Sequence, residues 1–118
     1  MWYQVVNYGG MEKNYLETSG SSIMAYAILK GVRLGISSRK LQRICRKKLL
    51  IGICDKYLNT KDGEMSLGGI CLVAGLGGKG NRPGTYDYYM SEPIVEDDAK
   101  GVGPFLLAYT EMLAYKNR

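Results

Sequence analysis

The amino-acid sequence predicts a mainly α-helical fold of about three helices with a small two-stranded β insert. Apolar residues recur at helical spacing over residues 18–34, 37–58 and 103–115. Between the second and third of these segments, clusters of glycine and tyrosine interrupt the helical spacing and predict two short strands. The chain has 118 residues, which is the length of one domain or of a part of a larger one.

The first helix is expected to run from about Thr18 to Leu34. Thr18, Ser19 and Ser21 are candidate N-caps, because a hydroxyl oxygen can accept a hydrogen bond from a free backbone N–H in the first turn. Gly35 predicts the end of the helix. The apolar stripe consists of Ile23, Ala27, Ile28 and Val32.

The second helix is expected from Ser37 or Ser38 to about Leu58, and it carries most of the positive charge. The chain has a formal net charge of +5. Six basic residues fall within ten positions: Arg39, Lys40, Arg43, Arg46, Lys47 and Lys48. Apolar residues recur at helical spacing along the same stretch: Leu41, Ile44, Cys45 and Leu49. The pattern favours an amphipathic helix with a basic, solvated face. A phosphate-binding helix is the alternative, although no aromatic residue is interleaved for base stacking.

The β insert begins at a turn, because Asp62-Gly63 suits positive φ. Strands are expected at Met65 to Val73 and Thr85 to Met90, joined by a glycine-rich loop from Gly75 to Gly84. Gly75 to Gly80 matches the G-x-G-x-x-G pattern of dinucleotide-binding loops. Such a loop must be followed directly by a helix N-terminus that holds the pyrophosphate, and here a strand is expected instead. We therefore interpret the segment as a hairpin loop.

The last helix is expected from about Gly103 to Tyr115. Pro104 would lie in its first turn, where a missing N–H costs nothing. Acidic residues precede this helix and favour capping and complementing its dipole: Glu96, Asp97 and Asp98.

The chemistry open to the chain is restricted by its composition. The absence of histidine excludes Ser–His and Cys–His nucleophiles, imidazole metal ligands and an imidazole pH switch. Cys45, Cys54 and Cys71 are odd in number and form no C-x-x-C motif, so we expect reduced thiols packed in the core, without a disulfide or a metal site.

Membrane insertion is not expected, because no apolar run reaches the roughly 18 residues of a membrane span. The N-terminus shows no basic segment followed by an apolar one, so no signal peptide is expected and the cytoplasm is the expected location.

Two groups of residues have either a structural or a sugar-binding interpretation. The Glu17 carboxylate at a helix N-terminus complements the helix dipole, or it binds a sugar hydroxyl. Tyrosines gather on the second predicted strand beside Ser91 and Glu92, where they serve packing or stack on sugars. These tyrosines are Tyr86, Tyr88 and Tyr89.

Taken together, these segments resemble a known family. Tyr15 to Ala27 reads YLETSGSSIMAYA and is similar to the "YLETSGSSMFAYA" stretch of the unsaturated rhamnogalacturonyl hydrolases, glycoside hydrolase family 105 and the related family 88. Further segments resemble the "W-x-Q-V" strand, the "GLGG" loop and the "YYLSEPIV…DAKGVGPFLLA" ending of that family. They are Trp2 to Val6, Lys30 to Gly35, Ala74 to Gly78, Tyr88 to Val95 and Asp98 to Ala108. The resemblance covers nearly the whole chain and is weakest over the second helix, Ser37 to Lys56.

The resemblance implies a fold and a reaction. The fold is an (α/α)6 barrel, six helical hairpins in a ring, and residues 1–118 would form a C-terminal portion of it. The family removes an unsaturated uronic acid from pectin-derived oligosaccharides. An Asp protonates the 4,5 double bond, water adds at C5, and the resulting hemiketal opens to release the rest of the saccharide. No metal or organic cofactor is implied.

The resemblance also implies that the chain is catalytically incomplete, because the family's catalytic Asp lies in an upstream part that has no counterpart here. No catalytic residue is assigned. The candidate residues of a substrate wall are Trp2, Gln4, Glu17, Ser19, Arg82, Tyr88, Tyr89, Ser91 and Glu92. Two alternatives remain, a non-catalytic sugar-binding or assembly remnant and, less favoured, a basic nucleic-acid-binding module.

The expected partners follow from the same reading. The ligand is an oligosaccharide that carries an unsaturated uronic acid, and the protein partner is either a second copy of the chain or the missing N-terminal half. Removing helices from a ring exposes apolar flanks, which monomers rarely tolerate. A two-fold homodimer is the favoured assembly. The flank residues include Ile23, Ile28, Leu106, Leu107 and Met112.

Overall fold

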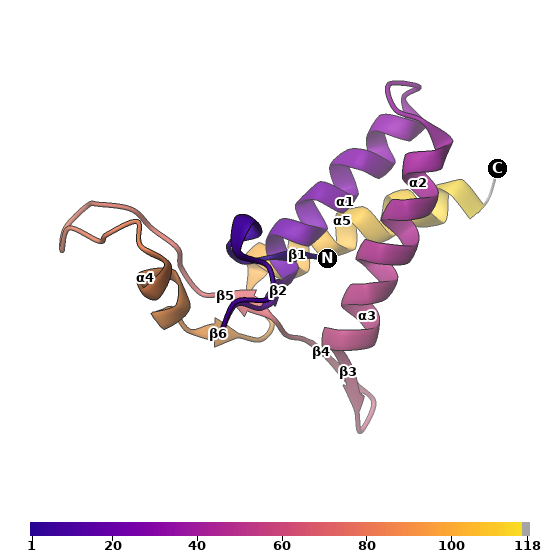
Figure 1. Cartoon of the computed structure of the whole chain (residues 1–118). Helices are drawn as coiled ribbons and strands as arrows, with labels where there is room; N and C mark the ends of the chain where they lie inside the picture. The colour runs from indigo at the N-terminus through magenta and orange to yellow at the C-terminus, as the bar shows by residue number, and fades with distance from the viewer. Residues whose placement is uncertain (117–118) are drawn as a thin grey trace.

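The computed structural model describes residues 1–116 and shows a helical body with short strands at one end (Figure 1). Helices α1 and α5 lie side by side and run in the same direction. The segment that contains α2 and α3 follows α1 in the sequence, precedes α5, and runs in the opposite direction. The described helices are α1 (Thr18–Arg33), α2 (Arg39–Cys45), α3 (Ile51–Tyr57), α4 (Tyr86–Ser91) and α5 (Ala99–Lys116), with the 3₁₀ turn η1 (Val6–Tyr8) and the π turn η2 (Arg46–Leu50). The mainly α prediction is confirmed.

Helix α1 begins where it was predicted, but its N-cap is Glu17 and none of the predicted hydroxyl residues. The Glu17 carboxylate accepts hydrogen bonds from the backbone N–H groups of Ser19 and Gly20, at 3.0 and 2.6 Å. A carboxylate satisfies two free N–H groups at once and also complements the helix dipole, which a single hydroxyl does not do. The Thr18 hydroxyl instead donates to the carbonyl oxygen of Gly68, at 2.8 Å.

The second predicted helix is present as one continuous helical path through α2, η2 and α3. Ser38 is its N-cap, and its hydroxyl oxygen accepts a hydrogen bond from the Leu41 N–H at 3.4 Å. Cys45 and Leu50 are five residues apart, yet only 1% and 2% of their surfaces are exposed. The π turn explains this, because its i to i+5 bonding brings residues five apart to the same side of the helix.

The core lies where α1, α5 and the second helical segment meet. Burial raises the pKa of the Cys45 thiol to about 11 and also raises the pKa of the Cys54 thiol. All three cysteines are free, as predicted, and those two remain protonated at neutral pH. The buried cluster consists of Ala25, Leu29, Cys45, Leu49, Leu50, Ile53, Leu67, Phe105 and Ala108.

The predicted two-stranded insert is only partly correct. Asp62 and Gly63 do form the predicted turn, with φ of 54° and 85°, which matches the twist of a tight hairpin. This hairpin pairs β3 (Leu58–Lys61) with β4 (Glu64–Leu67). A second pair joins β5 (Ile70–Cys71) to β6 (Ile94–Val95), and a third joins β1 (Trp2–Tyr3) to β2 (Leu16–Glu17).

The strand predicted over Thr85 to Met90 is wrong, because these residues start and form most of helix α4. The Thr85 hydroxyl oxygen accepts a hydrogen bond from the Tyr88 N–H at 3.3 Å and thereby caps the helix. Asp87 in the first turn also favours a helix. Tyrosine favours strands because its ring packs against the side chains of neighbouring strands. Residues 85–90 pair with no strand in the described part of the chain, so this preference has no effect here.

Helix α5 starts four residues before the predicted position, so Pro104 lies inside it and not in its first turn. The Asp98 carboxylate accepts a hydrogen bond from the Lys100 N–H at 2.9 Å, which confirms the predicted capping role for this acid. Pro104 removes the hydrogen bond that residue 104 would donate to residue 100. Gly103 limits the cost, because it has no Cβ to clash with the proline ring.

An ion pair between Arg33 and Glu111 fastens α1 to α5. The guanidinium donates two hydrogen bonds to the carboxylate, at 2.6 and 2.8 Å, and 11% of the Glu111 side chain is exposed. The hydrogen bonds from Arg33 lower the pKa of Glu111 below its ordinary value, although partial burial of the carboxyl group opposes this shift.

We predict that the free energy of unfolding decreases at acidic pH, because protonation of Glu111 removes its ion pair with Arg33. A carboxyl group with a depressed folded-state pKa contributes stability above its unfolded-state pKa and loses it as the pH falls. Glu111→Gln should therefore cost about 1 kcal/mol near pH 7, because Arg33 is partly solvated, and much less near pH 3. Urea unfolding at the two pH values measures the difference. An equal cost at both would contradict the assignment.

The molecule is more open than its length requires. Its radius of gyration is 15.4 Å, whereas a compact domain of this length has about 13.5 Å. The β3–β4 hairpin and the segment that carries α4 project from the helical body in two directions (Figure 1). Among residues 1–116, no helix combines the length and apolar character that crossing a membrane requires.

Candidate functional site

The first four predicted wall residues meet at the N-terminal end of α1. Trp2 on β1 pairs with Glu17 on β2, and the Trp2 N–H donates a hydrogen bond to the Ser21 hydroxyl oxygen at 2.9 Å. The Gln4 N–H donates to the carbonyl oxygen of Tyr15 at 2.8 Å, which continues the pairing. The short β1–β2 pair therefore holds the side chains of residues 2 and 4 beside the start of the helix.

The Glu17 carboxylate is buried, with 6% of the residue exposed, and it accepts four hydrogen bonds. Besides the two backbone N–H groups of α1, its donors are the Ser19 hydroxyl at 2.7 Å and the Cys71 N–H on β5 at 3.2 Å. These four hydrogen bonds support the structural interpretation of Glu17, in which its carboxylate stabilises the start of the helix. They join the helix start to β5 and occupy the carboxylate with donors of the chain itself.

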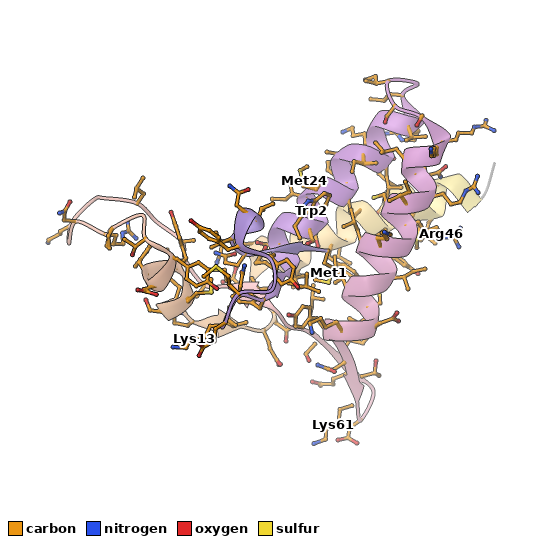
Figure 2. All side chains as sticks on the ribbon, viewed as in Figure 1. Met1, Trp2, Lys13, Met24, Arg46 and Lys61 are labelled. Atoms are coloured by element: carbon orange, nitrogen blue, oxygen red, sulfur yellow. The ribbon has the colours of Figure 1, made fainter. Side chains whose placement is uncertain are left out.

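A cavity of about 320 Å³ opens next to this carboxylate. Its lining is mostly apolar, and Trp2 and Met24 lie close together at its wall (Figure 2). The volume lies at the lower end of the range for small-molecule sites, which combine apolar walls with a few polar groups. The lining residues are Trp2, Tyr3, Gln4, Val6, Glu17, Gly20, Ser21 and Met24.

The other predicted wall residues gather around the glycine-rich loop and α4. Gly77 and Arg82 form an antiparallel bridge within this loop. The interpretation as a hairpin loop between two strands is only partly correct, because helix α4 follows the loop where a strand was expected. The five residues 81–85 separate the G-x-G-x-x-G pattern from α4. The Arg82 side chain donates to the carbonyl oxygen of Gly77 at 3.2 Å and lies directly over Gly75, where a Cβ would collide with the guanidinium. The glycine at 75 thus permits the arginine to fold back over the loop.

Tyr88, Tyr89 and Glu92 lie at the same end of the molecule. The Glu92 carboxylate next to the Tyr88 hydroxyl raises the pKa of this tyrosine, and the positive charge of Arg82 opposes the shift. The rings of Tyr88 and Tyr89 are 5.3 Å apart. Ser91 lines a different cavity of about 370 Å³ between α4 and residues 11–13. The nine predicted residues therefore fall into two groups, one at the start of α1 and one around α4.

Sequence reasoning missed Tyr15 and Cys71 as neighbours of this site. Burial and the nearby Cys71 thiol raise the pKa of Tyr15. The Gln4 side-chain amide donates a hydrogen bond to the Cys71 sulfur at 3.4 Å. Tyr15 could have been found, because residues two apart on a strand share a face and Glu17 was already a candidate. Cys71 had no such signal, since 54 residues separate it from Glu17.

The acidic and basic side chains of the site have limited chemical scope. Within residues 1–116, no group of three or more His, Cys, Asp or Glu side chains is suited to hold a metal ion.

The basic face of the second helical segment is exposed, and Arg46 points away from the core (Figure 2). In the part of the chain that the structure describes, none of its side chains forms an ion pair. They are Arg39, Lys40, Arg43, Arg46 and Lys48.

Comparison with known proteins places this geometry in context. Glycosyl Hydrolase Family 88 matches residues 1–116. Protein Atu3128 of Agrobacterium fabrum is 44% identical over 119 residues, which cover 96% of this chain and 51% of that protein. The 24.9 kDa protein in the picA locus of Rhizobium radiobacter has the same identity and coverage, 44%, 96% and 51%. The chain thus spans about half the length of these curated relatives.

A solved structure shares the fold. A glycoside hydrolase from family 105 of C. acetobutylicum superposes with a TM-score of 0.87 and is 51% identical in sequence. The match covers 93% of this chain and 31% of that one. The chain is therefore similar to about a third of that longer glycoside hydrolase.

Proposed function

Because the chain belongs to glycosyl hydrolase family 88, we propose that it forms part of the substrate wall of an unsaturated uronyl hydrolase. Its segment would be the C-terminal part of the (α/α)6 ring, as the sequence resemblance implies. The observation that carries the proposal is the cavity beside the start of α1, where Trp2 and Gln4 of the family-like W-x-Q-V strand both line the wall. The substrate would be a pectin-derived oligosaccharide that ends in an unsaturated uronic acid.

Each group of wall residues has a distinct role in this proposal. The Trp2 ring offers a flat apolar face to the C–H groups of a sugar ring. The Gln4 side chain donates to Cys71, which leaves its amide oxygen to accept from a sugar hydroxyl. Around α4, Tyr88 and Tyr89 offer further ring faces, and Arg82 retains N–H groups that suit a uronic acid carboxylate.

The chain by itself is expected to bind and orient sugar without completing the reaction. Protonation of the 4,5 double bond requires a positioned acid, and the acid at the start of α1, Glu17, already accepts four hydrogen bonds within the fold. The proton donor would come from the part of the family fold that this chain does not span. Water would then add at C5 and the hemiketal would open.

We predict that the purified chain leaves an unsaturated uronic acid disaccharide intact while binding it. Loss of the ultraviolet absorbance of the double bond measures turnover. Binding is measured by the fluorescence of Trp2, the single tryptophan of the chain, against a saturated disaccharide as control. Turnover that Glu17→Gln or Glu92→Gln abolishes would contradict the proposed incompleteness. Unchanged Trp2 emission at millimolar sugar would contradict the proposed wall.

A further inference from the structure

The sequence between Glu17 and Asp55 contains no acidic residue, although eight basic residues fall within it. Two of the eight have partners near the end of α1. Lys30 donates a hydrogen bond to a tyrosine hydroxyl of the same helix at 2.7 Å, and Arg33 pairs with Glu111 of α5. The positive charge of the second helical segment therefore has no acidic neighbour in its own stretch of sequence to compensate it.

Three arginines of this segment form a stripe, which we call the arginine stripe. Arg39, Arg43 and Arg46 follow one another at intervals of four and three residues, so they share one side of the helix. At a rise of about 1.5 Å per residue, they span about 10 Å along the helix axis. All three are exposed, and Lys40 lies exposed beside them.

The arginine stripe opposes the stability of its own helix. Arg39 and Lys40 lie in the first turn of α2, where the positive end of the helix dipole repels cations, and that turn contains no acid. Arg43 lies four residues from Arg39 and three from Arg46, and like charges at these spacings destabilise a helix. A segment that breaks such local rules without an evident structural gain is expected at a functional site.

Packing of the core does not require the stripe. The π turn η2 contacts α1 and α5, and the side of the segment that faces them carries the buried residues Cys45 and Leu49. The arginines lie on another side of the segment, and Arg46 points away from the core (Figure 2). The stripe is therefore a charged surface that is open to a ligand from solution.

We infer that the arginine stripe binds the carboxylates of an acidic polysaccharide, a polyuronate chain. A guanidinium group offers two parallel N–H donors to a carboxylate and keeps its charge at neutral pH. A polyuronate carries a carboxylate on each of its sugars, so one chain laid along the helix can meet several arginines at once.

Two observations favour a polyuronate over a nucleic acid. Residues 39–48 contain no aromatic side chain on which bases could stack. The choice of a polyuronate also rests on the proposed function, because such a chain would carry the uronic acid end that the cavity beside α1 is proposed to receive. The stripe itself lies outside that cavity, since none of its residues lines it.

The test measures binding of the purified chain to sodium polygalacturonate by isothermal titration calorimetry at low salt. Replacing all three arginines of the stripe with glutamine should weaken binding at least about tenfold, because each lost cation removes one contact with the polyanion. Fully methyl-esterified polygalacturonate has no carboxylates, so it should not bind. Equal affinity for the esterified and the charged polymer would overturn the inference.

The matched control removes the same amount of charge from elsewhere on the surface. It combines Lys13→Gln, Lys61→Gln and Lys79→Gln, whose lysines are all exposed and lie outside the second helical segment. Figure 2 shows Lys13 and Lys61 in other parts of the molecule than Arg46. An equal loss of affinity in both triple variants would overturn the inference, because net charge alone would then explain the binding.

Thermal unfolding tests whether the stripe serves the fold instead. The arginine variant loses its like-charge pairs and its cation in the first turn of α2, so its melting temperature should equal or exceed that of the unchanged chain. A lower melting temperature would overturn the inference. Tighter binding to single-stranded DNA or to phosphatidylglycerol vesicles than to polygalacturonate, at equal concentration of negative charge, would also overturn it.

The outcome is separable from that of the proposed function. The polygalacturonate has saturated ends, so its binding does not depend on recognition of an unsaturated uronic acid in the cavity. Polymer binding through the arginines, without a response of Trp2 fluorescence to the unsaturated disaccharide, would support the stripe and contradict the proposed wall. A Trp2 response without polymer binding would support the wall and overturn the inference about the stripe.

Discussion

Replacing Glu17 with alanine is expected to lower the free energy of unfolding by roughly 2–4 kcal/mol. The substitution removes the acceptor of four hydrogen bonds, and it takes from the buried Cys71 N–H the carboxylate oxygen that accepts its hydrogen bond. A midpoint of thermal unfolding lower by roughly 10 °C would follow. Circular dichroism during heating measures it.

The matched control is the other side-chain cap of a long helical segment. Ser38 is exposed and accepts one long hydrogen bond of 3.4 Å from Leu41, so Ser38→Ala should cost about 0.5–1 kcal/mol. Glu17→Gln keeps an oxygen acceptor and should fall between the two. If Glu17→Ala cost no more than Ser38→Ala, the carboxylate would not be the link between α1 and β5 that its hydrogen bonds describe.

Gly101→Ala is expected to destabilise the fold by roughly 1–3 kcal/mol, although alanine is the better helix former. Gly101 is buried in α5, and an added Cβ would collide with the Ile70 side chain, whose Cγ1 would be 2.5 Å away. Ile70 is fully buried on β5 and cannot move aside without disturbing its pairing with Val95. Urea unfolding measures the cost.

A second glycine in a helix interior provides the control with the opposite sign. At Gly52 in α3 an added Cβ would make an ordinary 3.7 Å contact with the flexible Met1 side chain. Gly52→Ala should therefore stabilise the chain by up to about 1 kcal/mol. Truncation of Ile70 to alanine should remove most of the cost of Gly101→Ala, and full cost in that background would show that the collision is not its cause.

The parts of the fold that sequence could predict are those that local spacing decides. The start of the first helix and the turn at Asp62 need no distant partner, and both were predicted correctly. The predicted apolar stripe was only partly right, because Val32 is buried whereas Ile23 and Ala27 are exposed. Ala25 and Leu29 face the core in their place. The pairing of Ile70 with Val95 and the contact of Glu17 with Cys71 depend on chain segments that only the folded core brings together. Helix α4 was missed because a threonine cap outweighed the strand preference of its tyrosines.

The candidate site was predictable to the same extent. Trp2, Gln4 and Glu17 were found through a family-like motif, and strand pairing does bring them together. The motif says nothing of how the carboxylate is used, and only its four hydrogen bonds reveal that the fold occupies it. The assignment of the nine residues to one wall remains a prediction.

The pairing of α1 with α5 has a consequence for the time at which the protein is made. Arg33 and Glu111 are 78 positions apart, so a ribosome that adds about 5–20 residues per second reaches the second about 4–16 seconds after the first. During that interval the nascent chain has α1 without its largest packing partner. Phe105 and Ala108, which close the core, also arrive with the last helix. Folding of this core is therefore completed only after α5 has been synthesised.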